Sequence, residues 1–546
     1  KNNLLTVIHM NRFFMTGLMV LMLLPATAAS PTINYKKVNA QALREYRQPL
    51  RPGTNGINPF WNGFAKKFIF APAFDFSETA GARQYLFEIS DAGGHQWTMK
   101  AKSPKASLAL VWEKIPGGTD VTLKVWALGQ DGQKMGQPVG ERSFLRDFPF
   151  QGPYNQPARP YKEAALKAML YIHRLKTIRH WADHQEPNMD YRHNTYACKI
   201  MGATIRNECL VAKYFPEERE VALQMARNVA AFLKSISQPE GTPLAYFPPT
   251  YYKGLIASAR QENQGTTMCM EAFSVGQGLL DLYDVTKDHQ YYDWALAIAD
   301  TYQKLQRPDG SLPIKLVIAT GEPVNQSRAM LYPLMCLLSR LHAEYGIGRY
   351  EAMRRKGEQW MHNVAIRDFN MTSQFEDGSV LNLQPYENMT NCTAAPYADY
   401  LYSRSESTAA DLQDAEDLMR LSEDQFTFWD MKPQPNGLHR HHTPCVYEQY
   451  KYQMSVDNSA CNVAAGFLSK YERMGDQLAL AKALALTNSL TIVQNVCTGQ
   501  IPTTWEQRTN VDASLSFWLN CQLSSVNQLL RMDEALRGRS TFRFYS

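Results

Sequence analysis

Several features that would assign this chain of 546 residues to a familiar class are missing from its sequence. Its nine cysteines form no CxxC pair and no HExxH motif is present, so neither a zinc ribbon nor a zinc-protease helix is indicated. It has no long run of lysine and arginine, and its formal net charge is only +5. We therefore expect no metal, no other cofactor and no nucleic-acid partner.

Long apolar runs are also scarce, and the one with a targeting pattern lies near the N-terminus. Arg12 precedes an apolar stretch at residues 13–24, which the small residues Ala26 and Ala28 follow. This pattern is typical of a secretory signal peptide cut after Ala28, and the stretch is too short for a membrane span. We expect translation to start at Met10 and the mature protein to be periplasmic or secreted, with no membrane span.

The cysteines are scattered between Cys198 and Cys521, and most lie in apolar stretches with a helical pattern. An odd number of cysteines leaves at least one free thiol in an oxidising compartment. We expect buried packing thiols rather than a disulfide framework.

The first structured region, residues 60–150, has the pattern of an all-β domain. Short apolar or alternating segments are separated by turns rich in glycine, as at residues 91–94 and 129–132. Several short strands at this spacing predict an antiparallel sandwich. The expected strands are residues 64–74, 85–90, 95–102, 108–114 and 121–128.

After a proline-rich linker at residues 151–160, the sequence of residues 161–546 becomes helical and repetitive. Roughly twelve segments follow the 3.6-residue period. Helices that are apolar nearly all round alternate with one-sided helices, which predicts buried inner helices inside an outer ring, an (α/α)6 toroid. Residues 29–59 are an N-terminal extension. The predicted inner helices are residues 194–215, 265–285, 326–345, 393–403, 457–474 and 511–532. The predicted outer helices are residues 163–181, 217–236, 290–306, 351–366, 411–429 and 477–496.

The connections between these helices also alternate in length. Connections from an inner to an outer helix are short, whereas those in the other direction are long, as at residues 237–264 and 430–456. All long loops then lie at the N-termini of the inner helices. Long loops on a rigid scaffold usually carry function, and the positive ends of helix dipoles favour an anionic group there.

Carboxylates near the predicted starts of inner helices are the candidates for chemistry. Glycoside cleavage usually uses two carboxyl groups, one that donates a proton and one that activates water or attacks the sugar. Glu262 and Asp457 are the first candidates for this pair, and Glu448 and Asp512 follow. Asp457 and Asp512 fit helix N-caps equally well, so that alternative stays open.

Aromatic and polar residues of the same loops are candidates for substrate binding. Aromatic rings stack on the C–H faces of pyranoses, and polar side chains bind hydroxyl groups. The arginines and Lys451 are candidates to hold a uronate carboxylate through charge-assisted hydrogen bonds. The predicted substrate-binding residues are Tyr251, Tyr252, Arg260, Arg440, His441, His442, Tyr452, Trp505 and Arg508.

Two parts of the chain resemble known families. Val111-Trp112, Ile115-Pro116-Gly117 and residues 121–132 resemble a fibronectin type III-like module. With the helical hairpins that follow, the whole chain resembles exported bacterial (α/α)6-barrel glycoside hydrolases of the glucuronidase and unsaturated glucuronyl hydrolase types. The resemblance implies an exo-acting, β-glucuronidase-like hydrolase whose substrate is a uronic-acid-containing oligo- or polysaccharide.

Two other functions stay open. A polysaccharide lyase would need a base that takes the proton next to the carboxylate, and Tyr252, His441, Tyr447 and Tyr452 are candidates for it. A non-catalytic glycan-binding protein would need only the aromatic and polar loop residues. A conjugated alkene in the product would identify the lyase, whereas binding without turnover would identify the binding protein.

Overall fold

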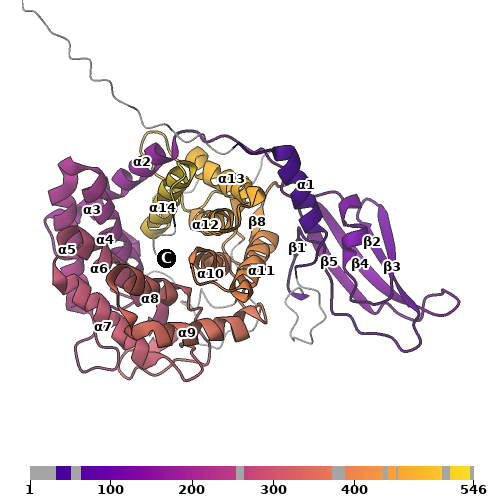
Figure 1. Ribbon diagram of the computed structural model, residues 1–546, viewed down its shortest axis with the longest axis horizontal. Helices are drawn as coiled ribbons and strands as arrows, with labels where there is room; N and C mark the ends of the chain where they lie inside the picture. The colour runs from indigo at the N-terminus through magenta and orange to yellow at the C-terminus, as the bar shows by residue number, and fades with distance from the viewer. Residues whose placement is uncertain are drawn as a thin grey trace, which may run out of the picture.

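The computed structural model describes two parts, a ring of helices and a smaller unit built on a β-sheet (Figure 1). The predicted signal peptide, residues 1–28, lies outside the described residues. Where the chain is described, no helix is long and apolar enough to cross a membrane. The described residues are 32–50, 63–253, 263–371, 386, 388–433, 441–450, 453–506 and 517–541.

Six described helices form an inner ring in which each helix contacts the next and the last contacts the first (Figure 1). Six more pack around them, and each outer helix contacts an inner one. The inner helices are α4 (Ala197–Tyr214), α6 (Ala272–Thr286), α8 (Tyr332–Tyr345), α10 (Asn391–Ser403), α12 (Asp457–Met474) and α14 (Leu519–Leu536). The outer helices are α2 (Tyr161–Arg174), α5 (Arg219–Ile236), α7 (His289–Leu305), α9 (Glu351–Trp360), α11 (Ala409–Phe426) and α13 (Gln477–Val493).

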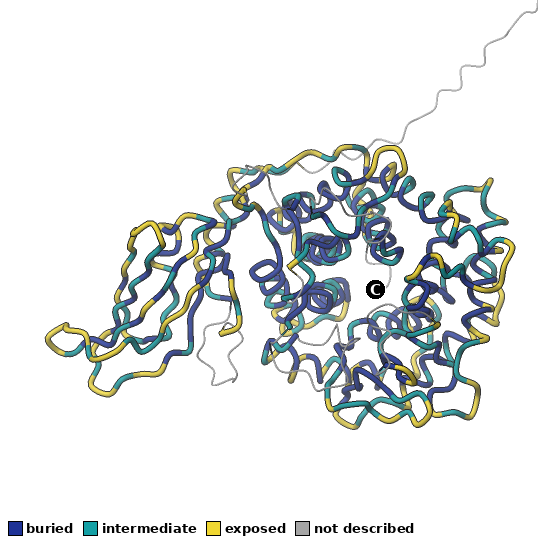
Figure 2. Tube along the Cα trace, turned by 180° about the vertical axis from the view of Figure 1, so that it is seen from behind, coloured by how far each residue is buried: buried dark blue, intermediate teal, exposed yellow. Residues whose placement is uncertain are grey.

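This arrangement confirms the predicted double ring of helices. The chain closes it by packing the first outer helix, α2, against the last inner helix, α14. Small residues let the inner helices approach closely: a Cβ atom on Gly202 of α4 would lie 2.9 Å from the backbone of Ser274 in α6. Figure 2 shows buried residues throughout the ring and exposed residues on its outer loops.

The ends of the inner helices explain why short and long connections alternate. Gly346 and Gly475 end α8 and α12 in the left-handed conformation, each with a φ of 70°. Glycine adopts this conformation without steric cost, so the chain reverses within a few residues. Asp476 then caps α13 by accepting a hydrogen bond from the Leu478 N–H at 3.0 Å. The N-termini of all six inner helices therefore lie at the opposite end of the ring, beside the long connections.

Short elements lie within these connections and around them. Two pairs of antiparallel strands stiffen the long connections, β6 with β7 and β8 with β9. The short elements are α3 (Lys176–Arg179), β6 (Thr266–Met268), β7 (Lys315–Val317), β8 (Thr427–Phe428), β9 (Cys445–Val446) and a π-helical turn, Met361–Ile366, that continues α9. All nine thiols are free, and seven of them are buried.

The N-terminal unit is one five-stranded sheet with the order β1-β5-β4-β2-β3. β1 pairs with β5 in parallel and the other pairs are antiparallel. The predicted sandwich would need a second sheet, and among residues 63–150 the structure shows none. The strands are β1 (Lys67–Phe68), β2 (Gln84–Asp91), β3 (Gln96–Ala101), β4 (Thr119–Leu128) and β5 (Gly140–Arg146).

The apolar face of this sheet is covered by irregular segments instead. Residues 108–114, predicted as a strand, form two 3-10 turns that bury Trp112 completely. The Trp112 indole N–H donates to the Ile69 carbonyl at 2.7 Å, and its ring lies 6.2 Å from that of Phe144 in β5. A short apolar run cannot by itself distinguish a strand from a turn that carries a buried ring, and here the burial of Trp112 decides for the turn.

Buried polar contacts fix the sheet unit to the ring. Asp424 of α11 accepts hydrogen bonds from the backbone N–H groups of Ile69 and Phe70, at 2.6 and 2.9 Å. Lys67 of β1 donates to Asp147 at 2.8 Å and to the Thr427 carbonyl at 2.8 Å. Helix α1 (Tyr35–Tyr46) lies between the two parts (Figure 1). The two parts are therefore joined by a polar, fully buried seam.

Candidate functional site

Each of the six inner helices contributes at least one side chain near its N-terminus to a set that we call the inner-ring cluster. The helices supply these side chains from their first turn or from the residues just before it. The cluster also includes Glu448, from the connection between α11 and α12. Its members are Lys199, Glu271, Tyr332, Cys392, Glu448, Asp457, Trp518 and Cys521.

The side chains of this cluster share one region, because α14 packs against both α4 and α12 and Glu448 contacts Cys392 at the start of α10. Burial raises the pKa of the Cys521 thiol well above its usual value. The negative charges of Asp457 and Glu448 raise it further, and the Lys199 ammonium lowers it. These four residues come from α14, α12, the α11–α12 connection and α4, so ring closure brings them together.

Asp457, the first residue of α12, is fully buried. Its carboxyl accepts hydrogen bonds from the Ser525 hydroxyl at 3.1 Å and from the Asn458 N–H at 2.8 Å. Burial raises its pKa well above the usual value and the Glu448 charge adds to this, although the two hydrogen bonds act in the opposite direction. Asp457 therefore keeps its proton to a higher pH than an exposed aspartic acid, which is the state a general acid requires.

Glu448 has a different environment, because it is half-buried and held by the start of α10. Its carbonyl accepts hydrogen bonds from the Thr390 hydroxyl at 3.0 Å and the Asn391 N–H at 3.2 Å. The Cys392 thiol donates to the Glu448 carboxylate at 3.7 Å. When two carboxyl groups lie in different environments, their pKa values differ, so one can act as the acid and the other as the base or nucleophile.

An ion pair lies on another side of the cluster, between α4 and α6. Lys199 Nζ is 3.2 Å from Glu271 Oε1. Burial raises the pKa of Tyr332, the first residue of α8, while the charge of Glu271 raises it and that of Lys199 lowers it. The pair therefore faces the same region as the N-terminus of α8.

Four ring side chains form what we call the aromatic wall: His193 and Tyr196 before α4, Trp518 before α14, and Tyr251 from the α5–α6 connection, which forms a β-bridge with Tyr196. The His193 and Trp518 rings stack with centroids 3.9 Å apart and planes at 26°. Tyr196 lies 5.3 Å from Trp518 and 6.0 Å from Tyr251. The Lys199 ammonium is 5.5 Å from the Tyr196 centroid and 5.9 Å from that of Trp518. Such a wall suits the C–H face of a sugar.

The structure brings some predicted residues together and leaves others outside its description. Asp457 and Glu448 share the inner-ring cluster, and Tyr251 belongs to the aromatic wall. Tyr252 instead packs edge-on against Phe232 of α5, with ring centroids 5.0 Å apart. The predicted residues outside the described part of the chain are Arg260, Glu262, Arg440, Lys451, Tyr452, Arg508 and Asp512.

Three other predicted sugar-binding residues support the start of α12. His441 is fully buried, and its ring nitrogen is 3.1 Å from the Ser455 hydroxyl. Burial lowers the pKa of the His442 imidazole, and the backbone N–H of His442 donates to the Trp505 carbonyl. The backbone N–H of Trp505 donates to the Ser455 carbonyl, and 4% of Trp505 is exposed. These contacts give the three residues a positioning role next to Asp457, and His441 presents no exposed ring face to a sugar. Within the described residues no group of three or more His, Cys, Asp or Glu side chains is arranged to hold a metal ion.

Sequence reasoning missed Lys199, Glu271, His193, Cys392 and Trp518. It searched the long loops, whereas Lys199 and Cys392 lie inside the first turns of inner helices. Trp518 precedes α14, which begins at Leu519 rather than at the predicted residue 511. The available signal was a charged residue, Lys199, at the start of an otherwise apolar segment.

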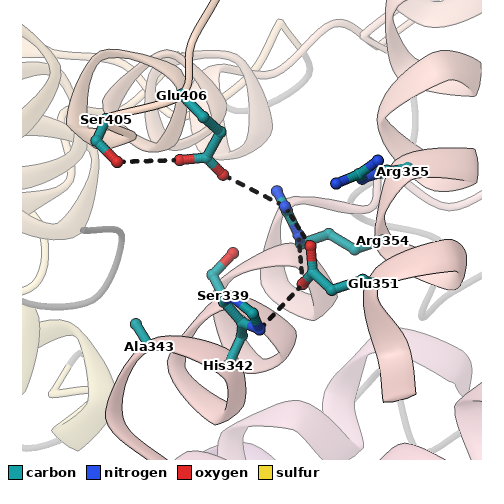
Figure 3. A pocket seen from close by; sticks show the side chains of 8 residues that line it. All are labelled: Ser339, His342, Ala343, Glu351, Arg354, Arg355, Ser405 and Glu406. Atoms are coloured by element: carbon teal, nitrogen blue, oxygen red, sulfur yellow. Dashed lines mark hydrogen bonds and ion pairs between the residues drawn. The ribbon is translucent and has the colours of Figure 1, made fainter. Parts of the chain in front are cut away.

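A pocket of about 270 Å³ lies at the opposite end of the ring, between the end of α8 and the start of α9 (Figure 3). Four of its lining side chains pair with one another: Arg354 contacts Glu351 at 2.7 Å and Glu406 at 3.3 Å, and His342 lies 3.8 Å from Glu351. These contacts join α8, α9 and the segment after α10. The pocket is therefore part of the scaffold, and the inner-ring cluster is the candidate active site.

No protein-family model matches the sequence, and no curated protein matches it either. The structure is similar to a family 76 glycoside hydrolase from a bovine Bacteroides thetaiotaomicron strain, with a TM-score of 0.45 and 10% identity over 82% of this chain and 92% of that one. It is also similar to cellobiose 2-epimerase from Spirochaeta thermophila, with a TM-score of 0.47 and 9% identity over 68% of this chain and 98% of that one. For unsaturated glucuronyl hydrolase from Bacillus sp. GL1 the TM-score is 0.42 and the identity 15%, over 69% of this chain and 98% of that one. At these scores and identities the likenesses assign no activity to this chain.

Proposed function

We propose that the chain is an exported, exo-acting glycoside hydrolase of uronic-acid-containing glycans, β-glucuronidase-like, with Asp457 and Glu448 as its carboxyl pair. The observation that carries the proposal is the buried, hydrogen-bonded Asp457 within electrostatic reach of Glu448. The positive ends of the six inner helices support an anionic substrate. The resemblance of the sequence pattern to glucuronidase-type families supports the sugar class.

In this mechanism Asp457 donates its proton to the glycosidic oxygen as the bond to the leaving sugar breaks. Glu448, the more accessible carboxyl, activates a water molecule or attacks the anomeric carbon, and the stereochemistry of the product distinguishes these two routes. Because Asp457 is fully buried, the mechanism requires the side chains that cover it to move when substrate binds.

A lyase has less support from the described residues. Its base must accept a proton near neutral pH, but His441, one of the candidates for it, is fully buried. Tyr252 and Tyr447 are the half-buried candidates that stay, and the Tyr447 ring lies 5.3 Å from that of His441. The lyase is therefore kept as an outcome of the test.

The test is a product screen with purified protein on uronate-capped plant and host glycans. We expect a saturated uronic acid as the product. Asp457→Asn and Glu448→Gln should each lower kcat/KM about 10²- to 10⁴-fold, the usual contribution of acid–base catalysis. Circular dichroism and the Tm report whether each variant folds.

The matched controls are Asp293→Asn and Glu217→Gln, which change exposed carboxylates of outer segments. They should leave kcat/KM unchanged. A product that absorbs in the ultraviolet would identify a lyase, and full turnover by both active-site variants would refute the carboxyl pair. Glycan binding without turnover by the wild-type protein would identify a binding protein.

A further inference from the structure

The Lys199–Glu271 ion pair stands next to the aromatic wall and is partly open to solvent. The Lys199 side chain is 31% exposed and that of Glu271 10%. Both belong to the first turns of neighbouring inner helices or the residues just before them, so the scaffold holds them in place. The half-buried rings of His193 and Trp518 stack beside them. Together these four side chains form a surface that is apolar on one side and polar on the other.

The ion pair offers a ligand one donor group and one acceptor group rather than a net charge. A sugar hydroxyl can accept a hydrogen bond from Lys199 and donate one to Glu271 at the same time. A uronate carboxylate cannot donate to Glu271, and the negative charge of Glu271 lies only 3.2 Å from the Lys199 ammonium to which the carboxylate would bind. Repulsion would then offset attraction. The chemistry of the pair therefore favours a neutral, hydroxyl-rich ring.

The same region adjoins the carboxyl pair. Asp457 accepts a hydrogen bond from the Ser525 hydroxyl of α14 at 3.1 Å, and Lys199 lies 5.9 Å from the ring of Trp518, the residue just before that helix. Trp518 lies one turn before Cys521 along the chain, and a stacked His193 fixes its ring. A sugar bound against Trp518 is therefore next to the position of bond cleavage.

We propose that Trp518, His193, Lys199 and Glu271 form a subsite for a neutral pyranose unit, adjacent to the carboxyl pair and distinct from the place of the uronate. The inference rests on the proposed function for the identity of the neighbouring sugar. It makes the substrate a mixed glycan in which an acidic sugar is linked to a neutral one. The aromatic wall packs against the C–H face of the neutral ring, and the ion pair binds its hydroxyl groups.

The test is binding of free monosaccharides to the full chain, measured by saturation-transfer NMR and calorimetry. The probes are glucose, galactose, mannose, xylose and glucuronate. Because these probes cannot be hydrolysed, the result does not depend on turnover. At least one neutral pyranose should bind wild-type protein, and Trp518→Ala and Lys199→Met should each weaken it about tenfold, the loss expected for one contact.

Glucuronate binding should be the same in wild-type protein and both variants. The matched control is Lys213→Met, which removes an exposed lysine of the same helix far from its N-terminus. Trp518→Phe and Glu271→Gln are milder changes that keep the test decisive if the first variants fail to fold. Equal binding of neutral sugars by all folded variants, or selective loss of glucuronate from Lys199→Met, would overturn the subsite. Loss of the proposed hydrolase activity alone would leave it standing.

Discussion

At the scale of single residues, the environment of Asp457 decides what its carboxyl can do. Burial favours the neutral form, whereas hydrogen bonds from Ser525 and Asn458 favour the charged form. Burial outweighs them, so the pKa is raised. The same aspartate on the surface would serve as an ordinary helix N-cap, and it is its complete burial that makes it suitable as an acid.

The Ser525→Ala variant isolates one of these influences. Removing the hydroxyl that donates to Asp457 should raise the Asp457 pKa further, because the lost hydrogen bond favoured the charged form. If Asp457 acts as the general acid, the alkaline limb of the pH profile of kcat/KM should move to higher pH. Ser524→Ala, which removes a hydroxyl bonded within α14 to the Asn520 carbonyl, is the control and should not move it. A shift to lower pH would contradict the assignment of the acid.

At the scale of elements, a buried histidine joins three helices at the end of the ring away from the candidate site. His173 of α2 is fully buried, with its Nδ1 2.5 Å from Glu208 of α4 and its Nε2 3.3 Å from Glu218. Burial lowers the His173 pKa, but the hydrogen bond and charge of Glu208 outweigh it, aided by Glu218, so the pKa is raised despite the nearby Arg179. Protonated His173 therefore strengthens the α2–α4–α5 joint.

This joint predicts a pH-dependent stability. Because the pKa of His173 is raised in the folded state, protonated His173 stabilises the fold fully at pH values below its unfolded-state pKa of about 6.5. This stabilisation is lost as the pH rises through the folded-state pKa. His173→Gln should lower the free energy of unfolding by about 2 kcal/mol at pH 5.5, the size of a hydrogen bond to a charged group, and by less at high pH. Urea denaturation at both pH values measures this. The exposed His184→Gln is the control, and a deficit that grows with pH would refute the sign.

At the scale of the whole molecule, the seam between the sheet unit and the ring depends on a buried acid. Asp424 accepts two backbone hydrogen bonds from residues 69 and 70, yet burial raises its pKa to about 6. Lys67 and the hydrogen bonds limit this shift. The charge on Asp424 is therefore costly near neutral pH, and the seam is strongest when Asp424 is protonated.

The Asp424→Asn variant tests this balance. The folded protein holds a proton on Asp424 between about pH 4 and pH 6 that the unfolded chain releases, so wild-type stability falls as the pH rises through that window. A shift of about two units corresponds to about 3 kcal/mol. The free energy of unfolding of the variant minus that of wild type should therefore be greater at pH 7 than at pH 4, by up to this amount. Urea denaturation at both pH values measures it. The exposed Asp430→Asn should show no such change, and an equal difference at both pH values would refute the effect.

The sequence by itself determined the helical ring. Helix α12 begins and ends at the predicted residues, Asp457 and Met474, because an apolar period and a terminal Gly475 are local signals. Even α10 was found within two residues, despite Pro396 inside it. Glycine turns after inner helices placed the long connections at one end, and from these the sequence predicted where carboxylates would gather.

Only the tertiary structure decided which side chains meet there. Lys199 and Trp518 are far apart in the sequence, and they lie side by side because α14 packs against α4 to close the ring. No local period encodes that closure, because it depends on the summed packing of all inner helices. For the same reason the pairing of Asp457 with Ser525, and the choice of a buried turn over a strand at Trp112, followed from burial that distant parts of the chain create.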